Sequence, residues 1–234
     1  MAAEILYGRN PVHEALRAGR RRLTEVSATK TAAKEPWLKG VRVRIEPAER
    51  IAKLAGTEAH QGICAVAEPY PYSGPAEILQ RADGLIVALD EIQDPQNLGA
   101  IARTAECAGA AGLVICERRA AHVTPAAVKA SAGATEHLRI ARAPNMADFL
   151  GQAKDAGFWC YGAAAEGAAP YLRPDYAGGV VLVIGAEGRG LRPRVASACD
   201  ELVALPLHGR IGSLNASAAA AALLYGILQR RESA

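Results

Sequence analysis

The feature that most constrains this fold is a series of short apolar runs separated by helical patterns. The runs lie at residues 85–89, 113–116, 158–162, 180–184 and 202–207, and the helical patterns at 97–110, 146–156, 192–199 and 214–231. Runs without polar alternation are typical of strands buried on both faces. Their alternation with helices predicts an α/β fold with a parallel sheet. Ligands of such sheets bind beyond the carboxyl ends of the strands, so those loops are the natural place for a site.

A smaller unit precedes this sheet. Residues 68–75 contain three prolines and a glycine, which indicates a domain boundary. Before it, the patterns predict helices at 11–17 and 48–55 and strands at 24–29, 41–45 and 62–67. We therefore expect a domain at 1–70, a linker at 71–79 and a second domain at 80–234.

The basic residues of the chain are concentrated in the first domain. Residues 1–70 hold 12 Lys and Arg against 8 Asp and Glu, whereas residues 71–234 hold 15 against 16. The excess includes the cluster Arg17, Arg20, Arg21 and Arg22, which could contact phosphate. On charge alone, a solvated helix end is the more common explanation of such a cluster.

Several classes of protein are disfavoured by composition. The apolar run at 216–228 is shorter than the roughly 20 residues that span a bilayer, and the first residues lack the pattern of a secretory signal, so we expect a cytoplasmic protein. Five widely spaced cysteines predict buried thiols rather than disulfides or a zinc site. The five histidines show no spacing for a metal site or a catalytic dyad.

The loop after the first apolar run carries Asn97 and Arg103, six residues apart. This spacing is a little under two helical turns, so both could face one cleft if Asn97 lies at the helix start. Alternatively, Asp94 or Asn97 is only a helix cap and Arg103 a solvated helix residue.

Two further loops combine glycine and polar residues. Gly185, Gly188 and Gly190 surround Glu187 in an order that matches neither the dinucleotide fingerprint nor a P-loop. The last loop carries Ser213, Asn215 and Ser217 at alternate positions, ahead of an almost wholly apolar helix. Helix capping alone would explain one of them, and the three together suggest a lined pocket. Such an apolar helix needs cover on its outer face, and a second subunit is one candidate.

Together and in this order, the three loops resemble the motifs of the SpoU (TrmH-like) family of RNA ribose 2′-O-methyltransferases. The matching stretches are NLGAIARTA at 97–105, IGAEGRGL at 184–191, LPL at 205–207 and SLNAS at 213–217. Stretches 7–16, 60–63 and 129–138 resemble the RlmB-type subgroup, which methylates a guanosine of large-subunit rRNA.

The resemblance implies a catalytic domain with a C-terminal trefoil knot that forms a homodimer, and an N-terminal domain similar to ribosomal protein L30e. The latter is shortened between residues 29 and 41. It also implies S-adenosylmethionine as methyl donor, no metal, and RNA rather than DNA or a membrane as partner. The catalytic residues implied are Asn97, Arg103, Glu187, Ser213 and Asn215. Those implied for the cofactor are Ile184, Gly185, Leu205, Leu207, Ser213, Leu214 and Asn215. For RNA we expect Arg9, Arg17, Arg20, Arg21, Arg22 and Arg103.

A sulfonium methyl donor is already activated, so the protein must mainly place and deprotonate the ribose hydroxyl. Arg103 is a poor base because its pKa exceeds about 12, and an electrostatic role on the developing oxyanion suits it better. Three other functions stay open at this stage: methylation of a tRNA ribose, a non-catalytic RNA-binding assembly factor, and a nucleotide-dependent oxidoreductase, which the glycine order disfavours.

Overall fold

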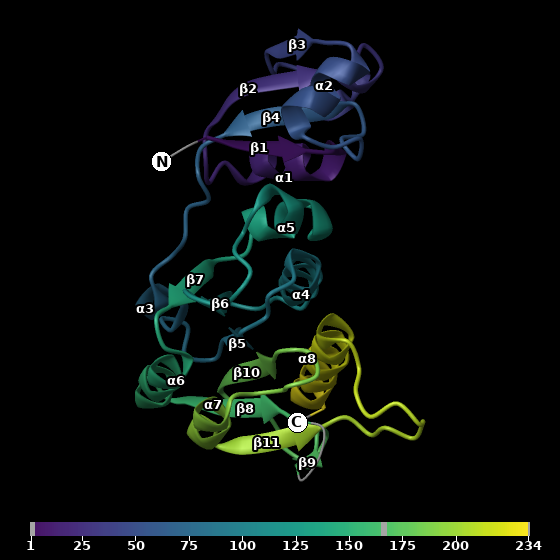
Figure 1. Cartoon of the computed structure of the whole chain (residues 1–234). Helices are drawn as coiled ribbons and strands as arrows, with labels where there is room; N and C mark the ends of the chain where they lie inside the picture. Colours follow the sequence, from purple (N-terminus) through teal and green to yellow (C-terminus); the bar gives the residue numbers. More distant parts are fainter. Residues whose placement is uncertain (1–2, 165–167, 234) are drawn as a thin grey trace.

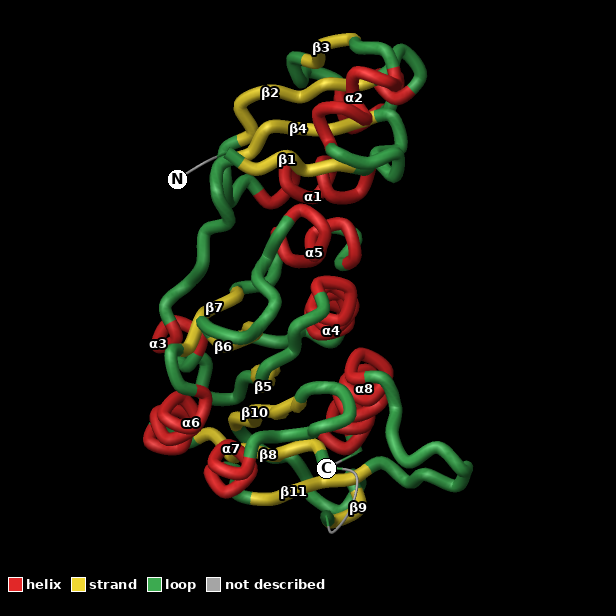
Figure 2. The backbone as a smooth tube through the Cα atoms, in the orientation of Figure 1, coloured by secondary structure: helices red, strands yellow, loops and turns green. Residues whose placement is uncertain are grey.

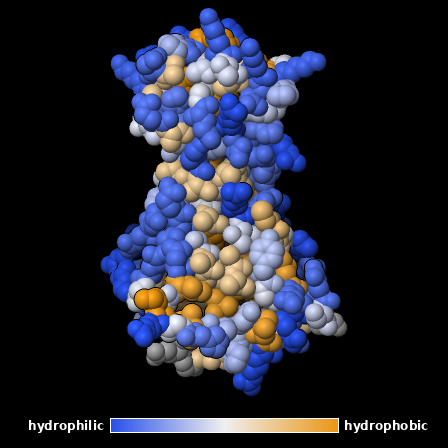
Figure 3. Space-filling model, turned by 90° about the vertical axis from the view of Figure 1, so that its right-hand side faces the viewer, coloured by the Kyte–Doolittle hydropathy of each residue, from blue (hydrophilic) through white to orange (hydrophobic). Residues whose placement is uncertain are grey.

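The computed structural model describes residues 3–164 and 168–233 and shows two units stacked end to end (Figure 1). Each unit is built on its own sheet. The smaller sheet has the strand order β1-β4-β2-β3, and the larger has the order β7-β6-β5-β10-β8-β11-β9. In the space-filling view the molecule narrows where the two units meet (Figure 3).

The N-terminal unit is an α/β domain whose strands are mostly antiparallel. Its elements are β1 (Glu4–Tyr7), α1 (Arg9–Ala18), β2 (Leu23–Ala28), η1 (Ala32–Lys34), η2 (Pro36–Leu38), β3 (Val43–Ile45), α2 (Ala48–Ala55) and β4 (Ile63–Ala67). The central strand β4 pairs antiparallel with β1 and β2, and β2 pairs parallel with β3. The short segment after β2 holds only the two 3-10 turns. Strand β1 was not predicted from the sequence.

The C-terminal unit contains the expected parallel sheet. Its elements are α3 (Pro75–Ile78), β5 (Leu85–Asp90), α4 (Pro95–Cys107), β6 (Gly112–Cys116), α5 (Pro125–Ala130), η3 (Ala134–Glu136), β7 (Ile140–Ala143), α6 (Met146–Asp155), β8 (Phe158–Ala163), β9 (Ala169–Pro170), β10 (Gly179–Gly185), α7 (Pro193–Ala198), β11 (Glu201–Ala204) and α8 (Ala216–Glu232). Every strand pair of this sheet is parallel. The α/β fold with a parallel sheet is therefore confirmed.

The two faces of this sheet are covered by different helices (Figure 2). Alternate residues of a strand point to opposite faces. Leu85 and Val87 of β5 accordingly belong to the core that includes α4 and α8, whereas Ile86 belongs to the core that includes α6 and α7. Burial of β5 on both sides explains why its sequence lacks polar alternation.

The expected run at 202–207 is only partly a strand. Strand β11 ends at Ala204, and residues 205–215 form an exposed segment that projects beside α8 (Figure 1). Helices α3 and α5 and strands β7 and β9 were also not expected. The segment 205–215 lies at the carboxyl end of a parallel strand, which is where the sequence placed a binding loop.

Candidate functional site

Three side chains from three separate loops meet at the carboxyl edge of the large sheet. The side-chain amide of Asn97 donates a hydrogen bond from Nδ2 to Glu187 Oε1 at 3.0 Å. Nδ2 of Asn215 donates to Asn97 Oδ1 at 3.0 Å and also to Glu187 Oε1. We call these residues the Asn97–Glu187–Asn215 triangle. It joins the ends of β5, β10 and β11, so the three motif loops form one site.

The helix starts around the triangle settle which residue acts as a cap. Asp94 is the N-cap of α4, because its Oδ1 accepts from the backbone N–H of Gln96 at 2.9 Å. Asn97 therefore keeps its side chain free for the triangle. Asn215 serves both purposes, since its Oδ1 also accepts from the backbone N–H groups of Ser217 and Ala218 at the start of α8.

The glycine loop after β10 folds tightly back on itself. Ala186 and Gly190 exchange backbone hydrogen bonds of 3.1 and 2.8 Å. A Cβ at Gly185 would lie 2.2 Å from the carbonyl carbon of Gly190, so no other residue fits there without moving the loop. Gly188 and Gly190 take positive φ angles of 73° and 66° that favour glycine. These glycines shape the loop that presents Glu187.

A clamp missed by the sequence reasoning holds the far end of this loop. The Arg192 guanidinium donates to the fully buried Asp90 carboxylate at 2.8 Å from Nε, and Nη2 lies 2.6 Å from Oδ1. The backbone N–H of Arg192 also donates to Asp90 at 2.9 Å, and Nη1 lies 3.3 Å from Glu91 Oε1. The hydrogen bond with Asp90 raises the pKa of Arg192 despite partial desolvation. The sequence signal that could have pointed to this clamp was Asp90, a carboxylate directly after the apolar run 85–89.

A cavity of about 300 Å³ lies next to the triangle, between the glycine loop, the 205–215 segment and α8. Of the residues expected at the cofactor, its lining includes Ile184, Gly185, Leu205, Leu207, Ser213 and Leu214; Asn215 lies beside it in the triangle. The lining is mostly apolar, with Glu187 and Ser213 at its polar part. Such a cavity is of the size and character of a small-molecule site.

Several apolar side chains near this cavity stay exposed. Leu207, Leu214 and Ile211 are 37%, 46% and 77% exposed, and Tyr225 on α8 is 53% exposed. Figure 3 faces this side of the molecule and shows hydrophobic surface gathered on the larger unit, around a hollow. Exposed apolar surface of this kind marks a place where a ligand or another chain binds.

Arg103 is not a member of the triangle. It is exposed on α4 and follows Asn97 by six residues, about 9 Å along the helix axis. Within residues 3–164 and 168–233, no hydrogen bond or ion pair engages its guanidinium. The structure thus brings together Asn97, Glu187 and Asn215, with Ser213 at the cavity, and leaves Arg103 with all its donors available.

The arginines expected to bind RNA fall into two groups. Arg9, Arg17 and Arg22 are exposed; Arg9 pairs with Glu35 at 2.8 Å and Arg17 lies 3.5 Å from Glu14. Arg20 and Arg21 instead bind other parts of the protein, and the Arg21 side chain is 1% exposed. For Arg21 this differs from the expectation, because every nitrogen of its buried guanidinium already has a protein partner.

The expectation of buried thiols holds for Cys64, Cys116 and Cys160, but Cys107 is exposed and Cys199 is half-buried. Burial raises the pKa of Cys64 to about 11 and, together with Asp200, the pKa of Cys160 to about 12. A thiol nucleophile needs a lowered pKa, so neither thiol suits covalent catalysis. In the described part of the chain, no group of three or more His, Cys, Asp or Glu side chains is arranged to hold a metal ion. None of the helices described is long and apolar enough to cross a membrane.

The fold, the triangle and the cavity define a parallel-sheet domain with a small-molecule cavity at its carboxyl edge, attached to a smaller domain. The family described as "SpoU rRNA Methylase family" matches residues 84–225, and "RNA 2'-O ribose methyltransferase substrate binding" matches residues 5–73. The chain belongs to the SpoU rRNA methylase family.

Known proteins similar to the chain support this assignment. An uncharacterized tRNA/rRNA methyltransferase of Mycolicibacterium vanbaalenii is 40% identical over 99% of this chain and 78% of that protein. The crystal structure of the SpoU methyltransferase AviRb from Streptomyces viridochromogenes with AdoMet has a TM-score of 0.85 at 28% identity, covering 99% of this chain and 91% of that one. An AdoMet-bound rRNA methyltransferase from Sinorhizobium meliloti has a TM-score of 0.83 at 27% identity, covering 98% and 88%.

The protein is accordingly a tRNA/rRNA methyltransferase of the SpoU class, and S-adenosylmethionine is its methyl donor. The N-terminal domain is present as a substrate-binding domain. The features of the cavity fit this donor: a largely apolar lining suits the adenine ring, and the polar groups of Glu187 and Ser213 suit its polar parts.

Proposed function

We propose that the protein methylates the ribose 2′-oxygen of a guanosine in large-subunit rRNA. The observation that carries this proposal is the Asn97–Glu187–Asn215 triangle, which lies beside the cavity and joins all three motif loops. The name of the family matched by the N-terminal domain specifies ribose 2′-O methylation. The choice of rRNA rests on the resemblance of stretches 7–16, 60–63 and 129–138 to the RlmB-type subgroup.

The cavity residues would hold the methyl donor. Gly185 allows the glycine loop to fold back on itself. Leu205, Leu207 and Leu214 would cover the apolar surface of the donor. When bound, the donor supplies an electrophilic methyl group on a positively charged sulfur. The chain must then bring the ribose oxygen into line and keep the site ordered. Correct placement alone contributes up to roughly 7–11 kcal/mol to such a reaction.

Arg103 supplies the positive charge in this proposal. Its exposed guanidinium binds the phosphate next to the target nucleotide and stabilises the oxyanion that develops on the 2′-oxygen. The proton leaves to the phosphate or to water, because a guanidinium with a pKa above about 12 does not accept it at neutral pH.

Asn97 and Asn215 keep one geometry at all physiological pH values, because amides do not titrate. Glu187 Oε1 accepts from both amides and lies 3.4 Å from the backbone N–H of Ala216. Glu187 therefore braces the loops against each other. Ser213, at the cavity wall, completes the polar part of the site.

RNA binding uses the exposed arginines of the first domain, Arg9, Arg17 and Arg22, together with Arg103. Their contacts to phosphate predict an affinity that falls as salt concentration rises. Sequence-specific recognition of RNA mostly uses unpaired nucleotides, so the target guanosine is expected in a loop.

The proposal includes a homodimer through the catalytic domain and a C-terminal trefoil knot. The outer face of α8 supports the homodimer, because Ala218, Ala222 and Tyr225 are exposed along it, beside the exposed Ile211 and Leu214 of the preceding segment. A second copy would cover this apolar surface.

The test incubates the protein with methyl-labelled S-adenosylmethionine and, separately, unmodified large-subunit rRNA and unmodified tRNA. A 2′-O-methyl group makes the adjacent phosphodiester resistant to alkali, so the labelled nucleotide can be mapped. We expect label at one alkali-resistant guanosine of the rRNA. Arg103→Ala is the control for chemistry at this site and should lose most of the label.

Each other result corrects a different part of the proposal. Label in tRNA alone would retain the reaction and overturn the rRNA assignment. Label that alkali releases with single nucleotides would overturn ribose methylation in favour of base methylation. Label in neither RNA, with donor binding intact by calorimetry, would favour a non-catalytic assembly factor.

A further inference from the structure

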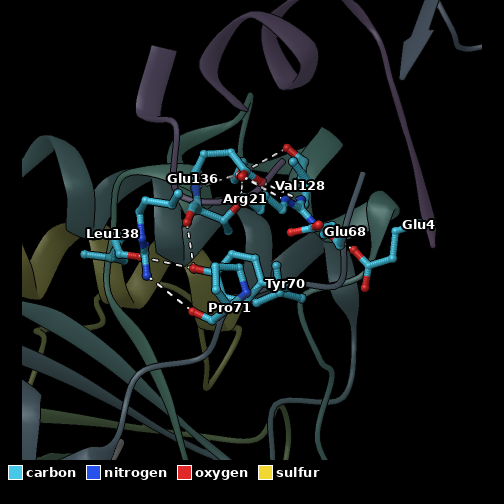
Figure 4. Close-up of polar contacts among 12 residues, drawn as sticks. Glu4, Arg21, Glu68, Tyr70, Pro71, Val128, Glu136 and Leu138 are labelled. Carbon is cyan, nitrogen blue, oxygen red and sulfur yellow. Dashed lines mark hydrogen bonds and ion pairs between the residues drawn. The ribbon is translucent and has the colours of Figure 1, made fainter. Parts of the chain in front are cut away.

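The two domains are joined by a buried ion pair that the catalytic site does not use. Arg21, which precedes β2, donates to Glu136 of η3 through Nε at 3.0 Å and Nη2 at 2.6 Å (Figure 4). Both side chains are 1% exposed. Nη1 of Arg21 donates to Glu4 at 2.7 Å and to the backbone carbonyl of Glu68 at 3.2 Å. The guanidinium is therefore fully engaged between the domains.

The segment that links the domains is fastened to the same place. The Tyr70 hydroxyl donates to the backbone carbonyl oxygens of Thr135 at 2.7 Å and Leu138 at 3.1 Å. Arg20 donates to the carbonyl of Leu138 at 2.7 Å and to that of Pro71 at 3.4 Å. Fixed carbonyl acceptors at these positions leave the linker little freedom to swing.

Apolar packing continues across the junction and reaches the catalytic helix. Leu6 and Val12 of the first domain belong to the same buried cluster as Val128 of α5 and Leu98 of α4. Helices α4 and α5 are in close contact, because a Cβ at Gly99 would lie 2.5 Å from the Cβ of Ala130. The unit formed by α5 and η3 thus lies between the N-terminal domain and α4, the helix that carries Asn97 and Arg103.

We propose that Arg21, Glu136 and Tyr70 are positioning residues that lock the substrate-binding domain to helix α4, so that the enzyme selects RNAs by a fixed distance between two elements. These are two elements of the RNA: one binds the first domain, and the other presents its ribose to the triangle. A domain on a flexible tether would accept many separations, whereas a locked one accepts a folded RNA that presents both elements together. This inference rests on the proposed RNA methylation.

The sequence stretch 129–138, noted for its resemblance to one subgroup, acquires a role in this proposal. It contains Glu136 and the carbonyl acceptors of Tyr70 and Arg20, and its Lys129 donates to Gln61 of the first domain at 2.7 Å. Its His137 lies 2.7 Å from Glu14 of α1. The stretch is the surface on which the first domain docks, rather than a part of the cavity.

The test weakens the contacts between the domains with substitutions that keep the size of each side chain, so no cavity opens beside Arg21. Tyr70→Phe removes two hydrogen bonds and keeps the ring, and Glu136→Gln removes a charge and keeps the shape. Two substrates are compared: the complete folded RNA that the wild type methylates, and a short hairpin with only the target loop. In the double variant we expect KM for the folded RNA to rise about tenfold with kcat unchanged, because fewer molecules hold the competent arrangement.

The hairpin and matched variants separate positioning from damage. Hairpin methylation and donor affinity should be unchanged in the double variant. Tyr7→Phe and Glu58→Gln make the same chemical changes in the first domain; Glu58 is 94% exposed, and the Tyr7 hydroxyl has no hydrogen bond in the part of the chain described. Neither should change KM. An equal loss on both RNAs, or no change on the folded one, would overturn the proposal.

A distance measurement tests the lock independently of activity. Spin labels are attached at Lys53→Cys on α2 and Gln152→Cys on α6, both exposed, in a Cys107→Ser background. The parent should give one narrow distance distribution and the Tyr70→Phe/Glu136→Gln protein a broader one. A broad distribution in the parent would overturn the lock. Absence of RNA methylation by the parent would instead count against the proposed function, and the distance result would stand by itself.

Discussion

The domain junction and helix α4 use arginine in opposite ways. At the junction, Arg21 is buried and each of its nitrogens has an oxygen partner in the protein. On helix α4, Arg103 is exposed, and no partner engages it among the residues that the structure describes. Both belong to the set that the sequence assigned to RNA.

The difference shows how to tell a structural charge from a functional one. Burying a guanidinium is costly unless a carboxylate and further acceptors compensate it, so a buried and saturated arginine has its whole role within the protein. An exposed arginine without a partner in the protein keeps its five donors for a ligand. The following predictions test this contrast, from the largest expected effect to the smallest.

Glu136→Ala should destabilise the protein by about 3–5 kcal/mol, because it leaves the buried Arg21 guanidinium without its main partner. Urea unfolding followed by circular dichroism measures this loss. Glu58→Ala is the matched control and should change stability by no more than about 0.5 kcal/mol, since its side chain is 94% exposed. A loss below about 1 kcal/mol for Glu136→Ala would remove the contrast between the two regions.

The parallel sheet and the three loops could be predicted from the sequence because their signals are local. Apolar runs and helical periodicity identify buried strands and helices. The resemblance of the three loops to family motifs implied Asn97, Glu187 and Asn215, which the structure brings into contact. The cavity likewise includes most residues expected at the cofactor.

The junction could not be predicted because its partners are distant in sequence. Arg21 and Glu136 are 115 positions apart, and neither has a neighbour that marks it as buried. A run of four arginines within six residues looks the same whether it faces phosphate or a carboxylate. The Asp90–Arg192 clamp, whose members are 102 positions apart, escaped for the same reason. Only the fold decides which charges are paired.

Arg103→Ala should lower kcat by about 10²–10³-fold, corresponding to about 2.7–4 kcal/mol of lost transition-state stabilisation. Its stability should stay within about 0.5 kcal/mol of the wild type, because the side chain is exposed. Single-turnover methylation and urea unfolding measure the two quantities on the same preparation. Arg103→Lys keeps the charge without the planar fork, so its kcat should lie between those of the wild type and Arg103→Ala. An inactive but also strongly destabilised Arg103→Ala protein would mean that this arginine, too, is structural.

Glu187→Gln should have the smallest effect, with a loss of less than about 1 kcal/mol in stability and most of the methyl transfer retained. The substituted side chain keeps an oxygen that accepts from Asn97 and Asn215, so the triangle holds with neutral hydrogen bonds in place of charge-assisted ones. Glu187→Ala removes that acceptor and should weaken donor binding further, measured by calorimetry. Comparing the variants shows whether Glu187 acts through its hydrogen bonds or through its charge. If Glu187→Gln lost as much activity as Arg103→Ala, the carboxylate itself would take part in the reaction. Glu187 would then belong with Arg103 as a functional charge, and the proposed site would contain two of them.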